Sequence, residues 1–481
     1  MNRKIVFAVT GRLLEAMSLI LLLPAIVALI YRETCFLAFI ITAGISLSAG
    51  ILLRLLTRGY NKSLYAKEGF LIVALAWFSA SVVGCLPFLI SGEIKSFADA
   101  FFETVSGFTT TGASVVTNVE SLSHGILFWR SFTHWIGGMG VLVFMVAFVS
   151  NISDRAIHIL RAEMPGPVVG KIVPRSKDTS KVLYSMYIVL TLVQIILLWL
   201  GDMNLFESII HTFGTAGTGG FGLKGDSISS YSAYSQWIIT IFMLIFGVNF
   251  NLYYLLTIKR LKPVLKSTEL WTYIGLFCVS TLIIVLNVSN MYPTISETIR
   301  TSAFQVASIM TTTGFATTDF NLWPQLSKTL LLILMFIGAC AGSTAGGLKV
   351  SRVVILFKMG LREIKRMIHP RSVGGVKFEG KDVDEHTKSS ITTYFAVYMI
   401  CFFVILFLLS FESAPFDFET NFSAVAACFN NIGPGFEIVG PMGNYAAFSA
   451  FSKVTLSFAM LFGRLEIFPL LIALIPSTWK K

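Results

Sequence analysis

A short motif rich in Thr and Gly occurs four times in this chain, each time between two long apolar segments. Glycine adopts backbone angles that other residues resist, so an extended Thr/Gly segment can turn successive carbonyl groups to one side. Carbonyl oxygens arranged around an axis can replace the water shell of a cation. The four copies therefore predict a cation filter within one polypeptide. The predicted lining residues are Thr110, Thr111, Gly112, Thr218, Gly219, Gly220, Thr312, Thr313, Gly314, Asn431, Ile432 and Gly433.

The four copies, called filters one to four, differ in detail. We align them on Gly112, Gly220, Gly314 and Gly433, which are separated by 108, 94 and 119 residues. Matching the aromatic residues that follow filters two and three favours Gly220 as the aligned residue, but Gly219 stays open as an alternative. Filter four, with the sequence NNIGP at residues 430–434, differs most from the others.

The composition indicates a polytopic membrane protein. Hydrophobic residues make up 55% of 481 positions and charged residues only 13%, which lies outside the ordinary soluble range. Windows of about 20 apolar residues are long enough to cross a bilayer. We predict ten such spans, at residues 12–31, 36–56, 69–90, 127–149, 182–200, 237–257, 271–288, 330–348, 391–409 and 451–475.

The placement of the net charge of +11 predicts the topology. Lys and Arg gather between alternate spans, at residues 54–67, 155–181, 259–266 and 349–388, and are few in the other connections. This positive-inside asymmetry predicts a multi-pass protein with both termini in the cytoplasm. The asymmetry also accounts for the excess of Lys and Arg over Asp and Glu, so no nucleic acid partner is needed to explain this excess.

Internal repeats define the predicted fold class, an all-α polytopic membrane protein. Two leading helices precede four units of helix, pore helix, filter and helix around a pseudo-fourfold pore. Each unit's second long helix also carries a glycine, at positions 137, 247, 338 and 463. The first two pore helices begin with carboxylates, which favour the positive end of a helix dipole. The predicted divisions are 1–68 for the leading helices, then 69–152, 153–262, 263–372 and 373–481 for the repeats.

With these features the chain resembles the Trk/Ktr/HKT superfamily of potassium transporters over nearly its whole length, and its motifs are most similar to those of TrkH proteins. The likeness rests on SGFTTTGA at residues 106–113, RAEMPGP at 161–167, CAGSTAGGLK at 340–349 and LFGRLEIF at 461–468. The resemblance implies potassium uptake across the bacterial inner membrane, with potassium as the transported ion and no cofactor. It also implies a homodimer and a cytoplasmic nucleotide-binding regulatory ring of the TrkA type. Glycine in all four filters implies selectivity for potassium.

A gate is predicted beneath the filter. Four glycines at residues 338–347 disfavour a continuous helix, and a broken helix at membrane depth must face a cavity or other protein. In the family that the chain resembles, this segment is an intramembrane loop that obstructs the pore; tight helix packing is the alternative. Arg464 is expected to face the ion path as a positive barrier, with a buried structural ion pair as the alternative. The predicted gate residues are Gly346, Gly347, Lys349 and Arg464.

Other functions are less well supported by the sequence. An ion-coupled secondary transporter, driven by protons or sodium, also uses repeats and broken helices and is the main alternative. An enzyme would need a cluster of catalytic or metal-binding side chains, and the sequence offers none. We interpret His134 and His211 as packed or hydrogen-bonded residues. The basic segments 352–371 and 155–181 either anchor the chain at the cytoplasmic face or contact the regulatory ring.

Overall fold

The computed structural model describes residues 2–59, 65–140, 176–371, 374–412 and 415–479. The regular secondary structure of these residues is helical, apart from one antiparallel hairpin of strands β1 (Lys377–Phe378) and β2 (Lys381–Asp382). The prediction of an all-α polytopic fold is thus confirmed. Of the predicted divisions, those after residues 152 and 372 fall outside the described residues, and the other two fall in helices α4 and α14.

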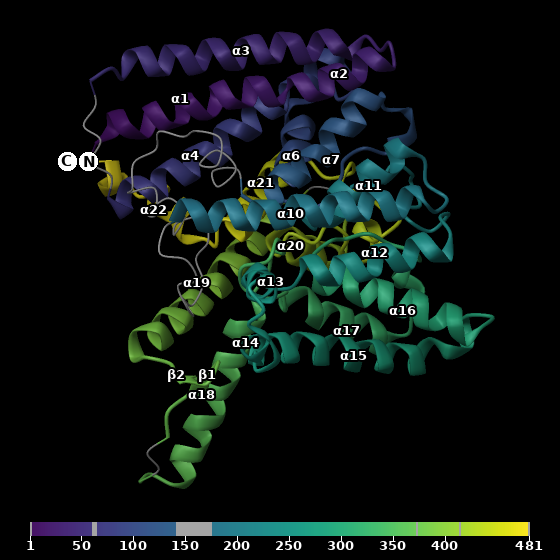
Figure 1. The fold of residues 1–481 in the computed structure, drawn as a ribbon, viewed down its shortest axis with the longest axis vertical. Helices are drawn as coiled ribbons and strands as arrows, with labels where there is room; N and C mark the ends of the chain where they lie inside the picture. The colour runs from purple at the N-terminus through teal and green to yellow at the C-terminus, as the bar shows by residue number, and fades with distance from the viewer. Residues whose placement is uncertain (1, 60–64, 141–175, 372–373, 413–414, 480–481) are drawn as a thin grey trace.

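The leading helices pack side by side along one edge of the bundle (Figure 1). They are α1 (Arg3–Ile20), its kinked continuation α2 (Leu22–Ile30) and α3 (Cys35–Leu56). A Cβ at Gly11 would lie 2.9 Å from the Gly50 carbonyl oxygen, so small residues let α1 and α3 approach closely. Between α2 and α3, Glu33 accepts backbone hydrogen bonds from His124 (2.8 Å) and Gly125 (2.9 Å) of the first repeat. Burial favours a higher Glu33 pKa, but these hydrogen bonds outweigh it and lower the pKa.

Each repeat supplies a long helix, a short pore helix and a second helix. Repeat one has α4 (Ala66–Gly84) with α5 (Leu86–Ser91), α6 (Phe97–Phe108) and α7 (His124–Gly138). Repeat two has α10 (Ser176–Trp199), α11 (Leu205–Gly217), and α12 (Ala233–Phe246) with α13 (Phe250–Thr257). Repeat three has α15 (Thr268–Val288), α16 (Ile295–Met310) and α17 (Gln325–Phe336). Repeat four has α19 (Glu385–Leu409), α20 (Phe418–Phe429) and α21 (Ala450–Arg464).

Shorter elements complete the fold. These are α14 (Leu261–Leu265), α18 (Val350–Ile368) and α22 (Phe468–Leu474), and the 3-10 turns η1 (Val119–Ser121), η3 (Ser289–Met291), η4 (Phe320–Leu322), η5 (Glu437–Val439) and η6 (Pro476–Trp479).

Three of the ten predicted spans, at residues 237–257, 330–348 and 451–475, are wrong as continuous helices. In the described residues six helices are long and apolar enough to cross a membrane, or seven if the pair α12 and α13 is one span bent by 89°. The predicted span 330–348 ends as a helix at Phe336, and the span 451–475 is interrupted between α21 and α22. The predicted span 127–149 lies partly outside the described residues, and its helix α7 ends at Gly138.

In repeats one and four, the second helix packs through its repeated glycine against the end of the pore helix. A Cβ at Gly137 would lie 1.9 Å from the Phe108 carbonyl oxygen, and one at Gly463 would lie 2.1 Å from that of Phe429. The second helices of repeats one and four therefore stop where they meet the end of their own pore helix. The glycines of repeats two and three have other partners: a Cβ at Gly247 would lie 2.4 Å from the Tyr273 hydroxyl oxygen, and one at Gly338 would lie 2.3 Å from the Gly346 carbonyl oxygen.

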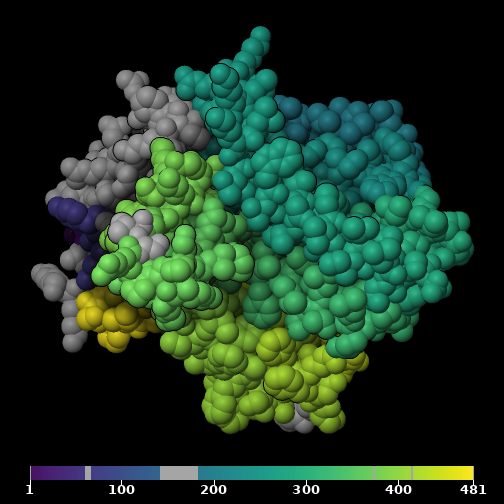
Figure 2. Space-filling model, turned by 90° about the horizontal axis from the view of Figure 1, so that it is seen from below, coloured from purple at the N-terminus to yellow at the C-terminus, as the bar shows by residue number. Residues whose placement is uncertain are grey.

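Helix α18 projects from the bundle on the side of the molecule away from α1 and α3 (Figure 1). Viewed from that side, the α18 and hairpin segment lies between the surfaces of repeats three and four (Figure 2). Val376 and Phe378 of the hairpin are buried against Ile355 of α18 and Ile391 of α19, so hairpin and helices pack as one unit. The chain termini lie together at one end of the bundle (Figure 1), where the Arg3 guanidinium donates to the Trp479 carbonyl.

Candidate functional site: a four-part filter and the loop beneath it

The pore helices begin with matching chemistry. Each has an acidic residue in its first turn, namely Asp99, Glu207, Glu297 and Glu419. Each is also capped by the residue before it, whose side chain accepts a backbone N–H of the first turn. The carboxylates stabilise the positive helix ends, and the opposite ends, which carry partial negative charge, lead directly into the filters.

All four filters have the same backbone geometry. Two residues in each, spaced two apart, have positive φ: 56° and 80° in filter one, 57° and 78° in two, 56° and 83° in three, and 57° and 100° in four. Left-handed backbone is costly for residues other than glycine, so four repeats of it indicate a shared constraint. The pattern resolves the register of filter two in favour of Gly220. The residues in these pairs are Thr110 and Gly112, Thr218 and Gly220, Thr312 and Gly314, and Asn431 and Gly433.

The filters meet in a closed ring. A Cβ at Gly112 would lie 1.9 Å from the carbonyl oxygen of Gly219 in the next filter. The same relation joins filter two to three (2.1 Å), three to four (2.0 Å) and four back to one (2.6 Å). Each glycine therefore leaves room for a neighbour's carbonyl, which no other residue could do without moving it. The carbonyls in this ring belong to Thr111, Gly219, Thr313 and Ile432.

Side chains behind the filters hold this ring in place. The hydroxyls of Thr109 and Thr111 are 2.8 Å apart, and those of Thr311 and Thr313 are 2.7 Å apart. The amide of Asn431 donates to the Thr111 hydroxyl at 3.0 Å, so it joins filter four to filter one. The predicted filter residues are thus brought together by the fold, and mostly buried side chains support them.

The two buried histidines serve as hydrogen-bonded packing residues, as predicted. His134 lies 2.8 Å from the Gly107 carbonyl through Nδ1, and its Nε2 is 3.3 Å from the Phe221 backbone nitrogen. His134 thereby connects the pore helix of repeat one to filter two. His211 lies 2.8 Å from the carbonyl of Glu207 in its own helix.

The segment 337–349, which we call the intramembrane loop, leaves helical geometry as predicted. Its backbone groups are satisfied by protein: Cys340 donates to the Gly247 carbonyl (3.1 Å), and the Gly342 carbonyl accepts from Phe250 (3.1 Å). The buried carboxylate of Glu269 accepts from the backbone of Ala341 at 2.7 Å. The loop is therefore seated between the break in repeat two and the start of α15.

The tip of the intramembrane loop touches the filters. The Gly346 N–H donates to the Thr312 hydroxyl at 2.7 Å. A Cβ at Gly346 would lie 2.6 Å from the Asn430 carbonyl oxygen, and Gly347 has a φ of 66°. Both predicted gate glycines thus occupy positions where a side chain would not fit without rearrangement.

The predicted gate cations surround the same loop. Arg464 donates to the carbonyls of Thr344 in the loop (2.7 Å) and of Gly138 in repeat one (3.0 Å). The ammonium group of Lys349 donates to the carbonyl of Ala345. Glu466 forms an ion pair with Arg352 of α18, consistent with its being a poor partner for Arg464.

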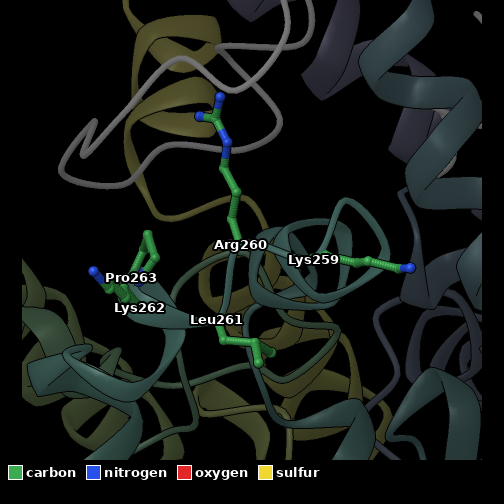
Figure 3. Close-up of a pocket in the computed structure, with 5 residues that line it drawn as sticks. All are labelled: Lys259, Arg260, Leu261, Lys262 and Pro263. Carbon is green, nitrogen blue, oxygen red and sulfur yellow. The ribbon is translucent and has the colours of Figure 1, made fainter.

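A pocket with cationic side chains lies between α13 and α14, but it does not form a ligand site comparable to the filters. Lys259, Arg260, Leu261, Lys262 and Pro263 line it (Figure 3). The three cationic side chains point away from one another, so they do not converge on a common ligand (Figure 3).

Sequence reasoning missed several residues that support the site. Glu103 and Arg130 form a buried ion pair behind filter one, Tyr445 donates to the Gly433 carbonyl, and Glu269 holds the loop. The signal for the first pair was available, because charged residues in apolar helices are rare and usually paired. No sequence signal indicated the contacts of Tyr445.

Comparison with known proteins places the chain in one family. Residues 36–481 match the family model of TrkH, described as a cation transport protein. The chain is 38% identical over 487 residues to the Trk system potassium uptake protein TrkH of Salmonella typhimurium, with both proteins covered in full. It is 34% identical over 485 residues to TrkG of Escherichia coli, with 99% of each covered.

A solved structure shares the fold as well. The crystal structure of the potassium transporter TrkH from Vibrio parahaemolyticus superposes with a TM-score of 0.90 at 36% identity, over 100% of each chain. Sequence, family model and fold agree over nearly the whole length. The chain belongs to the TrkH family of cation transport proteins.

Proposed function

We propose that this chain takes up potassium ions across the bacterial inner membrane through a channel-like filter. The observation that carries this proposal is the closed ring of four backbone carbonyls, each next to a glycine of the preceding filter. Such a ring offers a dehydrated monovalent cation neutral oxygen ligands from four sides. The ends of four pore helices add partial negative charge toward the same point. Relatives named as potassium uptake proteins support potassium as the ion.

The test is cation flux into proteoliposomes that contain this chain alone. Potassium and rubidium are expected to enter well above sodium and lithium, because a ring of fixed carbonyls favours the ion whose hydration shell it replaces. Flux is followed by isotope uptake or a fluorescent indicator with an imposed potassium gradient. Equal entry of all four cations would contradict the selective filter. Entry only with a proton or sodium gradient would favour the ion-coupled transporter instead.

We infer that the intramembrane loop is the gate. It lies directly beneath filters three and four, with its tip bonded to Thr312 and its middle bonded to Arg464. Cations must pass this loop to leave the filter on that side. The positive charges of Lys349 and Arg464 add an electrostatic barrier at the same place.

The proposed assembly is a homodimer with a cytoplasmic nucleotide-binding ring, both termini lying in the cytoplasm. Helix α18 is the proposed docking surface, because it projects from the bundle and follows the intramembrane loop directly. Its basic residues Lys365 and Arg366 are exposed, whereas Arg352 is buried against Glu466. A pull on α18 would thus act on the loop. The other predicted contact, at 155–181, falls mostly outside the described residues.

Charge reversal on α18 tests this docking surface. Arg362→Glu with Lys365→Glu is expected to weaken binding of the TrkA-type ring at least about tenfold, since one exposed charge at Lys365 and one partly exposed, ion-paired charge at Arg362 change sign. Binding is measured by biolayer interferometry on detergent-purified protein at two salt concentrations. The matched control is Arg54→Glu with Arg58→Glu at the end of α3, which leaves α18 unchanged and likewise reverses one ion-paired arginine, since Arg54 is paired with Glu15. Equal binding by both double variants would contradict the docking surface.

A further inference from the structure

A buried charged cluster lies behind filter one, and we call Glu103, Arg130 and Ser114 the Glu103 cluster. Glu103 on pore helix α6 is 1% exposed, and Arg130 on α7 is 3% exposed. The guanidinium meets the carboxylate through Nη2 at 2.7 Å and Nε at 2.8 Å. Both nitrogens meet the same carboxylate oxygen, Oε1, so Oε2 remains available as an acceptor for the Val115 N–H.

The same carboxylate holds the backbone that leaves filter one. The Ser114 hydroxyl donates to Glu103 Oε1 at 3.0 Å, and the Val115 N–H donates to Oε2 at 2.9 Å. Arg130 in turn donates to the Ser114 hydroxyl at 3.2 Å. Since Ser114 is two residues beyond Gly112, the cluster fixes one end of the filter segment.

The cluster also reaches two neighbouring filters. The guanidinium carbon of Arg130 lies 4.1 Å from the ring centroid of Phe221, which directly follows Gly220 of filter two. Tyr445 donates its backbone N–H to the Ser114 carbonyl (2.8 Å) and its hydroxyl to the Gly433 carbonyl of filter four (2.8 Å). One buried cluster therefore joins three of the four filters.

Only repeat one carries this ion pair. Counting back from the filter glycines, the positions equivalent to Glu103 hold His211, Gln305 and Ala424. Counting back from the second-helix glycines, those equivalent to Arg130 hold Thr240, Leu331 and Leu456. Three pore helices of the same fold thus form without the pair, so the fold itself does not require it. A buried ion pair is weak evidence for stability and needs another reason to be present.

We propose that Glu103 and Arg130 are specificity-determining positioning residues, which hold the carbonyl ring at the spacing that favours potassium over smaller cations. They touch no ion themselves. They act through Ser114 on filter one, through Phe221 on filter two and through Tyr445 on filter four. This inference rests on the proposed selective filter and names the residues that set its selectivity.

The experiment compares the potassium-to-sodium flux ratio of the wild-type chain, Glu103→Gln and the neutral double variant Glu103→Gln/Arg130→Met in proteoliposomes. Glu103→Gln leaves the Arg130 charge uncompensated, and its ratio is expected to fall about tenfold, or about 1.4 kcal/mol. The double variant removes both buried charges, so it is expected to fold as the wild type does. Its ratio is expected to fall about threefold or more, because the hydrogen bond from Arg130 to Ser114 and the contact with Phe221 are lost, and the remaining acceptor at position 103 carries no charge.

A matched control and a second readout separate selectivity from stability. Glu15→Gln makes the same chemical change in the ion pair between α1 and α3, where Glu15 lies 3.3 Å from Arg54, and should keep the wild-type ratio. Thermal unfolding and size-exclusion profiles report folding independently of flux. A folded double variant with the wild-type ratio would overturn the inference and leave the filter proposal intact, as would an equal loss in Glu15→Gln. A wild-type chain without potassium preference would overturn both proposals.

Discussion

Replacing Gly112 with serine is expected to remove most of the preference for potassium over sodium. A Cβ at this position would lie 1.9 Å from the Gly219 carbonyl oxygen, far inside ordinary carbon–oxygen contact of about 3.3 Å. The backbone there has a φ of 80°, which a serine adopts only with strain. The carbonyl of filter two must therefore move, and the ring loses its spacing. We expect the potassium-to-sodium flux ratio to fall at least about tenfold in proteoliposomes.

The control for this change is Gly225→Ser, made five residues beyond the glycine of filter two. A Cβ at Gly225 would meet no described atom within 4 Å, and its φ is not in the left-handed region. This variant is expected to keep the wild-type ratio and rate. If Gly112→Ser reconstitutes as folded protein and retains full potassium preference, the carbonyl ring is not the selectivity filter.

Removing Arg464 is expected to raise potassium flux through the chain in the absence of any regulatory partner. Two like charges about 4 Å apart, such as a cation and a guanidinium group, repel each other by roughly 1 kcal/mol in bulk water and by roughly 4 kcal/mol near a protein surface. Arg464→Ala removes both such a charge and the hydrogen bond that holds the Thr344 carbonyl of the loop. We expect the rubidium uptake rate per reconstituted chain to rise at least about fivefold.

Two further variants separate the charge from the anchoring role of Arg464. Arg464→Lys keeps the charge but loses the forked hydrogen bonding, so a charge barrier predicts low flux and an anchor predicts increased flux. Arg58→Ala, at an exposed position after α3, is the matched control and should leave flux unchanged. Loop movement is followed by alkylation of buried Cys340 as the single cysteine. Unchanged flux in Arg464→Ala, with only a lower yield of protein, would rule out the barrier.

The fold was largely predictable because its main signals are local. The Thr/Gly motifs, the acidic starts of the pore helices and the long apolar windows can each be identified from neighbouring residues, and the motifs then recur along the chain. The breaks after Phe246 and Arg464 were not predictable in this way. The turn after α21 places Glu466 and Ile467 at positive φ of 51° and 68°, although neither residue type favours that conformation. Long-range contacts, such as the ion pair from Glu466 to Arg352, accompany that geometry.

The filter residues were predictable individually, but their mutual contacts were not. A Thr/Gly motif indicates inward carbonyls, whereas the meeting of Gly112 with Gly219 depends on how two distant segments fold together. The register of filter two needed the backbone angles of Thr218 and Gly220. The partners of Glu103 are 11 to 27 residues away along the chain, on the filter exit and on another helix, so periodicity within one helix could not identify them.

The hydrogen bond from Gly346 to the Thr312 hydroxyl has a thermodynamic consequence. The proposed filter and the proposed gate share this hydrogen bond, so the proposed function couples their free energies. By reciprocity, an ion that stabilises one conformation of Thr312 changes the free energy of loop withdrawal by the same amount that withdrawal changes the affinity for the ion. The proposed gate is therefore expected to open with a probability that depends on the external concentration of the permeating ion, even with nothing bound at the cytoplasmic face.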